Sequence, residues 1–303
     1  MEIPLPRNAI EFDDLYRDED ACFQALVNAR WPDGFVCPRC QCERCWELKG
    51  GRLFECMDCA FQVSPTAGTL FHAAKLPLRK LFRLVYLLVC EKSGTNMCAL
   101  ARQVGVTYNT AMLWARKIRH AMVRPGRAKL SGTVEVDETT LGGPAEGYQG
   151  RSLGPNQALV LVLVEEAEPG VCGRVRLEFV ESGGAEHLRP AVKDNVEPGS
   201  TVRTDGWPGY TGVETDGFKR DTRKLKDGPS ATEELPLVHR VASLLKSFVQ
   251  GVLHGRWTKP WLPQLLDEFT FRFNRRTSRS RGKLFYRLAQ QAVQVGPAPF
   301  DSL

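Results

Sequence analysis

The sequence predicts a multidomain α+β protein, with a small cysteine-rich ribbon and a helical module ahead of an α/β domain with a mixed sheet. Three observations predict this order. Six of the ten cysteines lie between Cys37 and Cys59, the apolar residues over 77–122 recur with a helical period, and from residue 133 onward apolar and polar residues alternate as in β-strands. The 303 residues, 43% of them hydrophobic, suffice for two or three domains and at least one substantial core.

Breaks in composition divide the chain into five segments. A Pro-Gly break at residues 124–126 separates the helical module from the α/β domain. In chain order we expect a helical lead-in, the ribbon, the helical module, the α/β domain and a C-terminal tail over residues 1–30, 31–72, 73–126, 127–290 and 291–303.

The positive charge of the chain is concentrated in two blocks. The net charge is +6, but residues 73–130 carry twelve Lys or Arg against one acid, and residues 255–283 carry eight against two. A basic surface can serve solubility alone, whereas two separate blocks favour a polyanionic partner. No stretch approaches the roughly 20 apolar residues of a membrane span. The first residues also lack the basic start and apolar run of a secretory signal, so we expect a cytoplasmic protein with no membrane partner.

Two C-x-x-C knuckles separated by fifteen residues predict a zinc ribbon. Four thiolates leave no open coordination position, so the single Zn²⁺ is expected to be structural and to supply much of the folding energy. The alternative is a set of ordinary thiols without a metal. A third pair, Cys42 and Cys45, competes with the first knuckle, but a Cys-Pro-x-Cys spacing after the strand-like residues 34–36 favours the earlier pair. The predicted ligands are Cys37, Cys40, Cys56 and Cys59.

The segment 96–120 has the pattern of a helix-turn-helix. Ala101 and Gly105 stand four apart before a turn and a second amphipathic helix, and in this motif the second helix lies in the major groove of DNA. The alternative is a three-helix bundle with a solvated basic face, which the neighbouring ribbon and the charge imbalance disfavour. We expect groove contacts from the start of the second helix and phosphate contacts from its later turns. These residues are Thr107, Tyr108, Asn109 and Thr110, then Arg116, Lys117 and Arg119.

The rest of the pattern predicts an α/β domain in the order β-β-β-α-β-α, followed by one more helix. The expected strands are 133–141, 158–166, 173–182 and 201–205. The expected helices are 184–195, 234–253 and 261–275.

Two aspartates occupy informative places in these strands. Asp137 lies in the middle of the first strand, where an ionised side chain is costly unless it faces solvent or binds a cation. Asp205 ends the fourth strand. With the first strand central, the two carboxylates become neighbours and can share divalent ions, as two-metal phosphoryl chemistry requires. Taken singly, each is more often a strand-end or turn residue, but the pair in this element order favours a metal site.

The third ligand is expected on the helix over 234–253, whose body contains no carboxylate. His239 and Lys246 lie seven residues apart, about two turns, and therefore share one face. A histidine nitrogen can bind a metal, and a lysine can hold a phosphate. The alternative for His239 is an ordinary half-buried helix residue. The candidates that could replace it as the third ligand are Glu135, Glu233 and Glu234.

Taken in order, these motifs resemble the zinc-ribbon branch of bacterial insertion-sequence transposases with an RNase H-like DDE domain. The resemblance runs from about residue 20 to 290 and covers both knuckles, the helix-turn-helix, VEVDET–LGG, TDGW–Y, H–six residues–K and LDEFTFRFNRR. It implies Asp137 and Asp205 as ligands of two catalytic Mg²⁺ or Mn²⁺ ions, with His239 as the third ligand and Lys246 as the accompanying basic residue. The family's usual third residue is Glu, and here it is His.

By this resemblance the protein is an enzyme that binds insertion-sequence ends, cleaves DNA strands and transfers a 3′-hydroxyl into target DNA. The implied partners are double-stranded DNA, as terminal inverted repeats and target, and further copies of the chain assembled on it at the bacterial nucleoid. Arg272, Arg275 and Arg276 in FRFNRR are interpreted as DNA-backbone contacts, with a solvated helix face as the alternative. A histidine ligand also predicts better activity with Mn²⁺ than with Mg²⁺.

Two further functions compete with this interpretation. A catalytically inactive, domesticated or decayed transposase would act only as a DNA-binding protein; His239 in place of a carboxylate favours it, and the integrity of the rest of the chain disfavours it. An RNase H-like nuclease acting on RNA or branched DNA is disfavoured by the DNA-binding modules that precede the α/β domain.

Overall fold

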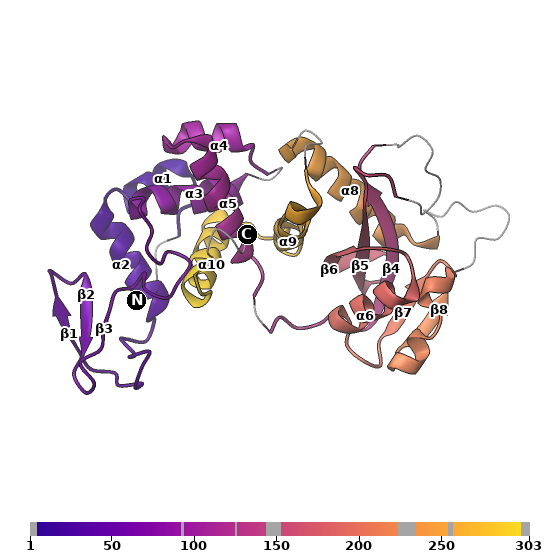
Figure 1. Cartoon of the computed structure of the whole chain (residues 1–303), viewed down its shortest axis with the longest axis horizontal. Helices are drawn as coiled ribbons and strands as arrows, with labels where there is room; N and C mark the ends of the chain where they lie inside the picture. Colours follow the sequence, from indigo (N-terminus) through magenta and orange to yellow (C-terminus); the bar gives the residue numbers. More distant parts are fainter. Residues whose placement is uncertain are drawn as a thin grey trace. The chain divides into compact units, whose positions relative to one another are not determined.

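The computed structural model describes residues 5–91, 94–124, 126–143, 153–223, 234–253 and 257–297. By internal contacts the chain forms two compact units, Met1–Arg124 together with Thr277–Leu303, and Pro125–Arg276. We call them the ribbon–helix unit and the sheet unit (Figure 1). The sequence assigned residues up to 290 to the α/β domain, whereas the segment after Arg276 groups with the ribbon–helix unit.

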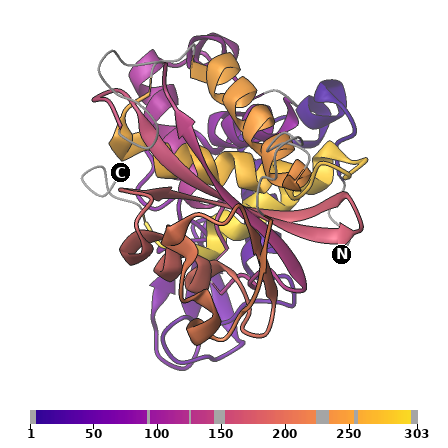
Figure 2. The ribbon, with the colours of Figure 1, turned by 90° about the vertical axis from the view of Figure 1, so that its right-hand side faces the viewer.

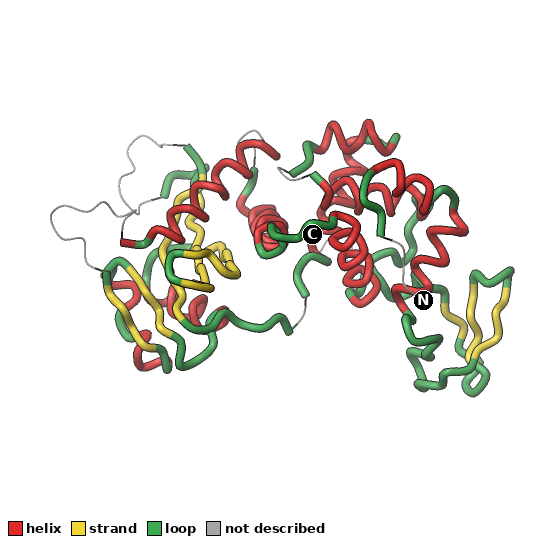
Figure 3. The backbone as a smooth tube through the Cα atoms, turned by 180° about the vertical axis from the view of Figure 1, so that it is seen from behind, coloured by secondary structure: helices red, strands yellow, loops and turns green. Residues whose placement is uncertain are grey.

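The ribbon–helix unit owes its core to helices from both ends of the chain, the indigo to magenta α1–α5 and the yellow α10 of Figure 1. Figure 3 draws all helices in red. The ring of Phe285 meets the ring of Phe12 edge-on at 5.3 Å, and Phe12 stacks on Tyr86 at 4.2 Å. The last helix, which the sequence did not predict, therefore completes an aromatic core begun by the first. The helices are α1 (Ala9–Leu15), α2 (Glu19–Arg30), α3 (Leu78–Cys90), α4 (Met97–Val104), α5 (Tyr108–His120) and α10 (Arg281–Gln294).

Three short strands form the antiparallel sheet of the ribbon, in the order β1-β2-β3. The Arg30 side chain, at the end of α2, donates hydrogen bonds to three backbone carbonyls of the loop 64–67 and so fastens this loop to α2. The strands are β1 (Cys45–Leu48), β2 (Leu53–Cys56) and β3 (Gln62–Val63). The small apolar cluster of this region contains Phe23, Trp31, Phe54 and Val63.

The sheet unit is built on five strands in the order β6-β5-β4-β7-β8. The pairs β4–β5 and β5–β6 are antiparallel, and β4–β7 and β7–β8 are parallel. The first strand is therefore central, and the strands twist relative to one another (Figure 2). The strands are β4 (Thr133–Leu141), β5 (Ala158–Glu168), β6 (Val171–Val180), β7 (Thr201–Thr204) and β8 (Lys219–Thr222). The sequence missed β8, because Lys-Arg-Asp-Thr shows neither an apolar run nor alternation.

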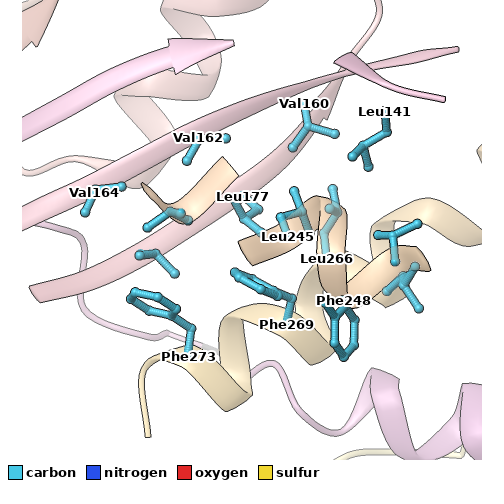
Figure 4. Packing of buried hydrophobic residues seen from close by; sticks show 14 of the residues in the cluster. Leu141, Val160, Val162, Val164, Leu177, Leu245, Phe248, Leu266, Phe269 and Phe273 are labelled. Carbon is cyan, nitrogen blue, oxygen red and sulfur yellow. The ribbon is translucent and has the colours of Figure 1, made fainter. Parts of the chain in front are cut away.

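Strand β5 is buried on both faces, which explains its nearly continuous apolar sequence. Val160, Val162 and Val164 pack against α8 (Pro236–Leu253) and α9 (Leu262–Phe273), as Figure 4 shows. The alternate residues Leu159, Leu161 and Leu163 belong to a second cluster with α6 (Ala185–Asn195). The sheet unit therefore has three layers, with α8 and α9 on one side and α6 on the other.

Three short 3-10 helices complete the described elements, η1 (Pro208–Tyr210), η2 (Val213–Asp216) and η3 (Lys259–Trp261). No helix in the described part of the chain combines the length and the apolar character that crossing a membrane demands. The expected tail, 291–303, is described only as far as residue 297.

Candidate functional site

The structure brings together the four cysteines that the sequence selected as zinc ligands. Their sulfur atoms all lie within 4.8 Å of one another. The Sγ atoms of Cys37 and Cys59 are 3.7 Å apart, and those of Cys40 and Cys56 are 3.4 Å apart. Four sulfurs at a Zn–S distance of about 2.3 Å in a tetrahedron would lie about 3.8 Å apart. The cluster therefore has the donor set and nearly the spacing of a structural zinc site.

The competing cysteines, Cys42 and Cys45, do not belong to this cluster of sulfurs. The Cys42 thiol contacts the backbone of Arg44, donating to its carbonyl at 3.6 Å, and Cys45 lies within β1. The backbone N–H of Cys37 instead bonds the Cys42 carbonyl at 2.9 Å and closes the first knuckle. In the second knuckle, the N–H of Cys59 lowers the pKa of the Cys56 thiol to about 6, which favours the thiolate that a metal binds.

Asp137 lies within β4, and Asp205 directly follows the last residue of β7, the parallel neighbour of β4. The register of β4 and β7 pairs Glu135 with Arg203, and each aspartate follows two residues later on its own chain segment. Side chains two residues apart on a strand share a face. The Oδ1 atom of Asp137 accepts from the N–H of Glu138 at 2.8 Å, and that of Asp205 accepts from Trp207 at 2.9 Å. Both carboxylates are thus oriented by local backbone groups.

His239 reaches this face from α8. Its Nε2 atom lies 3.9 Å from Oδ2 of Asp137, with 30% of the His239 side chain and 14% of the Asp137 side chain exposed. The three side chains do not form as tight a set as the cysteines, which among the described residues are the group of three or more ligands within 4.8 Å. Two ions about 3.5–4 Å apart would each take a different subset of ligands, so a wider spacing suits such a pair.

His239 and Lys246 also line one cavity, of about 650 Å³, along the side of α8. Thr139, two residues beyond Asp137 on β4, closes it from the sheet. The positively charged Arg240 and Lys246 therefore line this space together with the hydroxyl groups of Thr139, Ser243 and Ser247. Asp137 lies beside it, next to His239. The lining residues are Thr139, Pro236, His239, Arg240, Ala242, Ser243, Lys246 and Ser247.

Glu135, a candidate for the third ligand, is engaged elsewhere. It is 1% exposed, and its Oε2 accepts hydrogen bonds from the N–H groups of Leu237 and Val238 at 2.9 and 3.1 Å. Burial raises the pKa of its carboxyl. Glu234, also a candidate for the third ligand, is half-buried just before α8, and Glu233 lies outside the described residues.

Arg203 is a feature that the sequence reasoning missed. Its guanidinium lies 3.6 Å from Glu135, 3.3 Å from Glu166 and 2.9 Å from Asp221, and its side chain is 18% exposed. The signal was present in the alternation of TVRTD, which puts Arg203 on the face of Asp205 and opposite to Val202. A lone arginine on the inner face of a strand requires acidic partners.

The helix pair α4–α5 presents some of the expected DNA contacts to solvent and buries another. Gly105 ends α4 in the left-handed region, with φ 68°, and Thr107 caps α5. Thr107, Tyr108 and Asn109 are exposed. Arg116 and Lys117 are half-buried, and Arg119 is only 4% exposed. The start of α5 is therefore accessible to a ligand, whereas the Arg119 guanidinium is not.

The three arginines of FRFNRR make contacts within the sheet unit. Arg272 pairs with the fully buried Glu268, with Nη2 and Oε1 2.7 Å apart. Arg275 lies over the Phe271 ring at 4.0 Å. Arg276 donates to the carbonyls of Gly173 and Cys172 and so joins the end of α9 to β6. These contacts give each arginine a structural role alongside the predicted contact with DNA.

Comparison with known proteins agrees with this combination of a ribbon and an acidic sheet. Residues 129–274 match an ISXO2-like transposase domain, and residues 17–62 match a transposase zinc-ribbon domain. Both matched models describe parts of transposases, so the class of protein that the chain resembles is a zinc-ribbon transposase.

More narrowly, the two matched segments are a transposase zinc ribbon followed by an ISXO2-like transposase domain, which confirms the predicted resemblance to zinc-ribbon transposases. It is also similar to a protein of Halobacterium salinarum named "Uncharacterized protein in transposable element ISH50". The two are 27% identical over 221 residues, which make up 67% of this chain and 73% of that protein.

Proposed function

We propose that the chain is a DNA transposase that cleaves strands at the ends of its insertion sequence and joins them to target DNA through an RNase H-like sheet unit. The observation that carries the proposal is the sheet order β6-β5-β4-β7-β8, in which the central first strand carries Asp137 and its parallel neighbour β7 leads directly into Asp205. The matches to a transposase domain and a transposase zinc ribbon support it.

The residues present fit divalent ions. Asp137 and Asp205 offer carboxylate oxygens, which Mg²⁺ and Mn²⁺ both accept, and His239 offers a nitrogen, which suits Mn²⁺ better. When bound, two such ions would activate the attacking oxygen and stabilise the leaving oxygen of an in-line displacement. The 3.9 Å separation of His239 Nε2 from Asp137 Oδ2 supports a shared site for these two side chains.

The remaining residues of the site would hold DNA. Lys246 and Arg240 stand on the α8 side of the cavity and offer positive charge to phosphates, while Thr139 offers a hydroxyl from β4. The exposed start of α5, from Thr107 to Asn109, would read the insertion-sequence end in the manner of a helix-turn-helix. We extend the proposal to double-stranded DNA as the partner and to assembly of several chains on it.

The test is a strand-cleavage and strand-transfer assay on the element's own ends, in Mg²⁺ and in Mn²⁺. Asp137→Asn, Asp205→Asn and His239→Ala are compared with Asp194→Asn, a matched change of an exposed aspartate on α6, across the sheet. Loss of one ligand from a two-metal site is expected to lower cleavage by about 1000-fold or more, equivalent to about 4 kcal/mol in the barrier. End binding should stay unchanged, and Asp194→Asn should cleave like the wild type.

One observation favours the inactive transposase enough to shape this test. His239 lies 3.9 Å from Asp137 where the family usually has a carboxylate, and a site with one carboxylate fewer offers less negative charge to divalent ions. Wild-type protein that binds the ends but cuts in neither ion would identify a DNA-binding relic and remove His239 from the catalytic site. Cleavage of RNA or branched DNA in preference to the ends would point to the nuclease instead.

A further inference from the structure

Asp137 lies on β4 and Asp205 directly follows β7, and the register of these two strands pairs Glu135 with Arg203, each two residues before its aspartate. We propose that Glu135, held by Arg203, is a positioning residue that fixes the start of α8 and thereby sets His239 against Asp137. The inference rests on the proposed function, because it concerns the assembly of the same metal site.

Glu135 determines where α8 begins. The first N–H groups of a helix have no partner within it, and here the N–H groups of Leu237 and Val238 both donate to Oε2 of Glu135. The two residues lie 102 and 103 positions further along the chain. A carboxylate is also the charge that a helix N-terminus favours. The first turn of α8 is thus hydrogen-bonded to β4 through the Glu135 side chain.

Both ends of the His239–Asp137 contact depend on this attachment. His239 follows Val238 directly in the first turn of α8, and Asp137 lies two residues beyond Glu135 on the same face of β4. A shift of the helix start along β4 would therefore change the 3.9 Å separation of the two side chains. Displacements of about 1 Å at a reacting centre are enough to lower rates by about 100-fold.

Arg203 ties the same point to the neighbouring strands. It approaches Oε1 of Glu135 at 3.6 Å and also reaches Glu166 on β5 and Asp221 on β8. Arg203 precedes Asp205 by two residues, and Glu135 precedes Asp137 by two residues. The Glu135–Arg203 pair therefore comes just before the two aspartates on both segments of the chain. With 1% of the Glu135 side chain exposed, it has no access to DNA and acts only through its neighbours.

A second buried pair in the same unit provides a matched control. Glu165 on β5 accepts from Arg174 Nη2 at 2.6 Å and from the backbone N–H of Ser131 at 3.0 Å, with 15% of its side chain exposed. It resembles Glu135 in pairing with an arginine and in capping backbone N–H groups. None of these contacts involves α8.

The experiment compares Glu135→Ala, Glu135→Gln and Glu165→Ala in the full-length protein. Three quantities are measured: amide hydrogen exchange at Leu237 and Val238, Mn²⁺ affinity by electron paramagnetic resonance without DNA, and cleavage of the insertion-sequence end. For Glu135→Ala we expect lost protection at both amides and a 10- to 100-fold loss, roughly, in Mn²⁺ affinity and in cleavage, as for other residues that orient metal ligands. Glu135→Gln keeps an oxygen acceptor and should restore most of both. Glu165→Ala should lose thermal stability but keep Mn²⁺ affinity and cleavage.

Two results would overturn the inference. In one, folded Glu135→Ala binds Mn²⁺ as tightly as the wild type; in the other, Glu165→Ala loses Mn²⁺ affinity to the same degree, which would make the effect one of general stability. Because Mn²⁺ affinity is measured without DNA, a wild type that binds Mn²⁺ yet never cuts refutes the proposed function alone. A wild type that binds no Mn²⁺ refutes both.

Discussion

The ribbon and the sheet unit each carry side chains that could bind metal, and the two sets are assembled in opposite ways. In the ribbon they are the four cysteines, and in the sheet unit they are Asp137, Asp205 and His239, which we call the acidic site. The cysteine ligands lie within 22 residues of one another and are surrounded by a small apolar cluster. The acidic site depends on contacts such as that between Glu135 and Leu237, 102 residues apart, and lies over two extensive cores. In the ribbon the metal is expected to hold the fold, whereas in the sheet unit the fold is expected to hold the metals.

The largest effect should come from removing zinc, because the ribbon is the part whose folding is expected to depend on its metal. Structural zinc supplies about 10–16 kcal/mol in small cysteine sites, so a strong chelator should unfold the ribbon and leave the sheet unit folded. Hydrogen exchange read peptide by peptide would show lost protection over residues 34–63 and unchanged protection in β4 to β6. Equal loss of protection in the ribbon and in the sheet unit would contradict the expectation that only the ribbon depends on zinc.

The matched variants for this prediction are Cys40→Ser and Cys42→Ser. Cys40 is within the cluster of sulfurs and Cys42 is outside it. Zinc measured per purified chain should fall well below one for Cys40→Ser and stay near one for Cys42→Ser. The reverse pattern would mean that Cys42 and Cys45 hold the metal in place of Cys37 and Cys40.

A smaller effect should appear at low pH, where we expect the sheet unit to lose stability. Hydrogen bonds from Arg174 lower the pKa of the Glu165 carboxyl to about 2, from an ordinary value of 4.5. Because the folded pKa is the lower one, this carboxylate stabilises the fold fully above about pH 5, and the contribution is lost as the pH falls from 4.5 toward 2. Its size is about 2–3 kcal/mol.

Unfolding of the sheet unit by urea, followed by hydrogen exchange in β5, would measure this contribution. Glu165→Gln should be less stable than the wild type at about pH 6, and the difference should shrink as the pH approaches about 3. A difference that stays constant with pH would assign the effect to packing rather than to charge.

The smallest effect should come from changing His239, the proposed third metal ligand on α8, which tests how this ligand sets the preference between Mn²⁺ and Mg²⁺. His239→Glu replaces a nitrogen by a carboxylate, so we expect the ratio of Mn²⁺- to Mg²⁺-supported cleavage to fall about 10-fold, or about 1.4 kcal/mol. His187→Gln on α6 is the matched control and should leave the ratio unchanged. A wild type that already prefers Mg²⁺ would contradict the assignment of His239.

Local patterns were sufficient for most of the fold. The knuckle spacing predicted the ribbon and its ligands, and the alternation and apolar runs predicted β4, β5, β6 and β7 within a few residues of their bounds. The element order also predicted a central first strand with the fourth strand as its neighbour, and the sheet order β6-β5-β4-β7-β8 agrees with it. Each of these inferences needed only short-range information.

What could not be predicted depends on contacts between distant parts of the chain. Glu135 carries the same strand-face pattern as Asp137, and only the folded structure shows that it binds the backbone of α8 rather than facing the open site. Arg119 has the helical position of a phosphate contact but is buried. Helix α10 is amphipathic without a local sign of which unit it joins, and the answer lies in the aromatic partners of Phe285.

The ribbon–helix unit is interrupted in sequence by the whole of the sheet unit, since the chain leaves it after Arg124 and returns at Thr277. Phe285, which completes its aromatic core, is therefore translated only after the whole of the sheet unit. At synthesis rates of about 5–20 residues per second, the sheet unit leaves the ribosome complete while the N-terminal helices still lack a core partner. A premature stop codon just after residue 276 would accordingly spare the unit with the aspartates and leave the unit with the zinc ribbon unfinished.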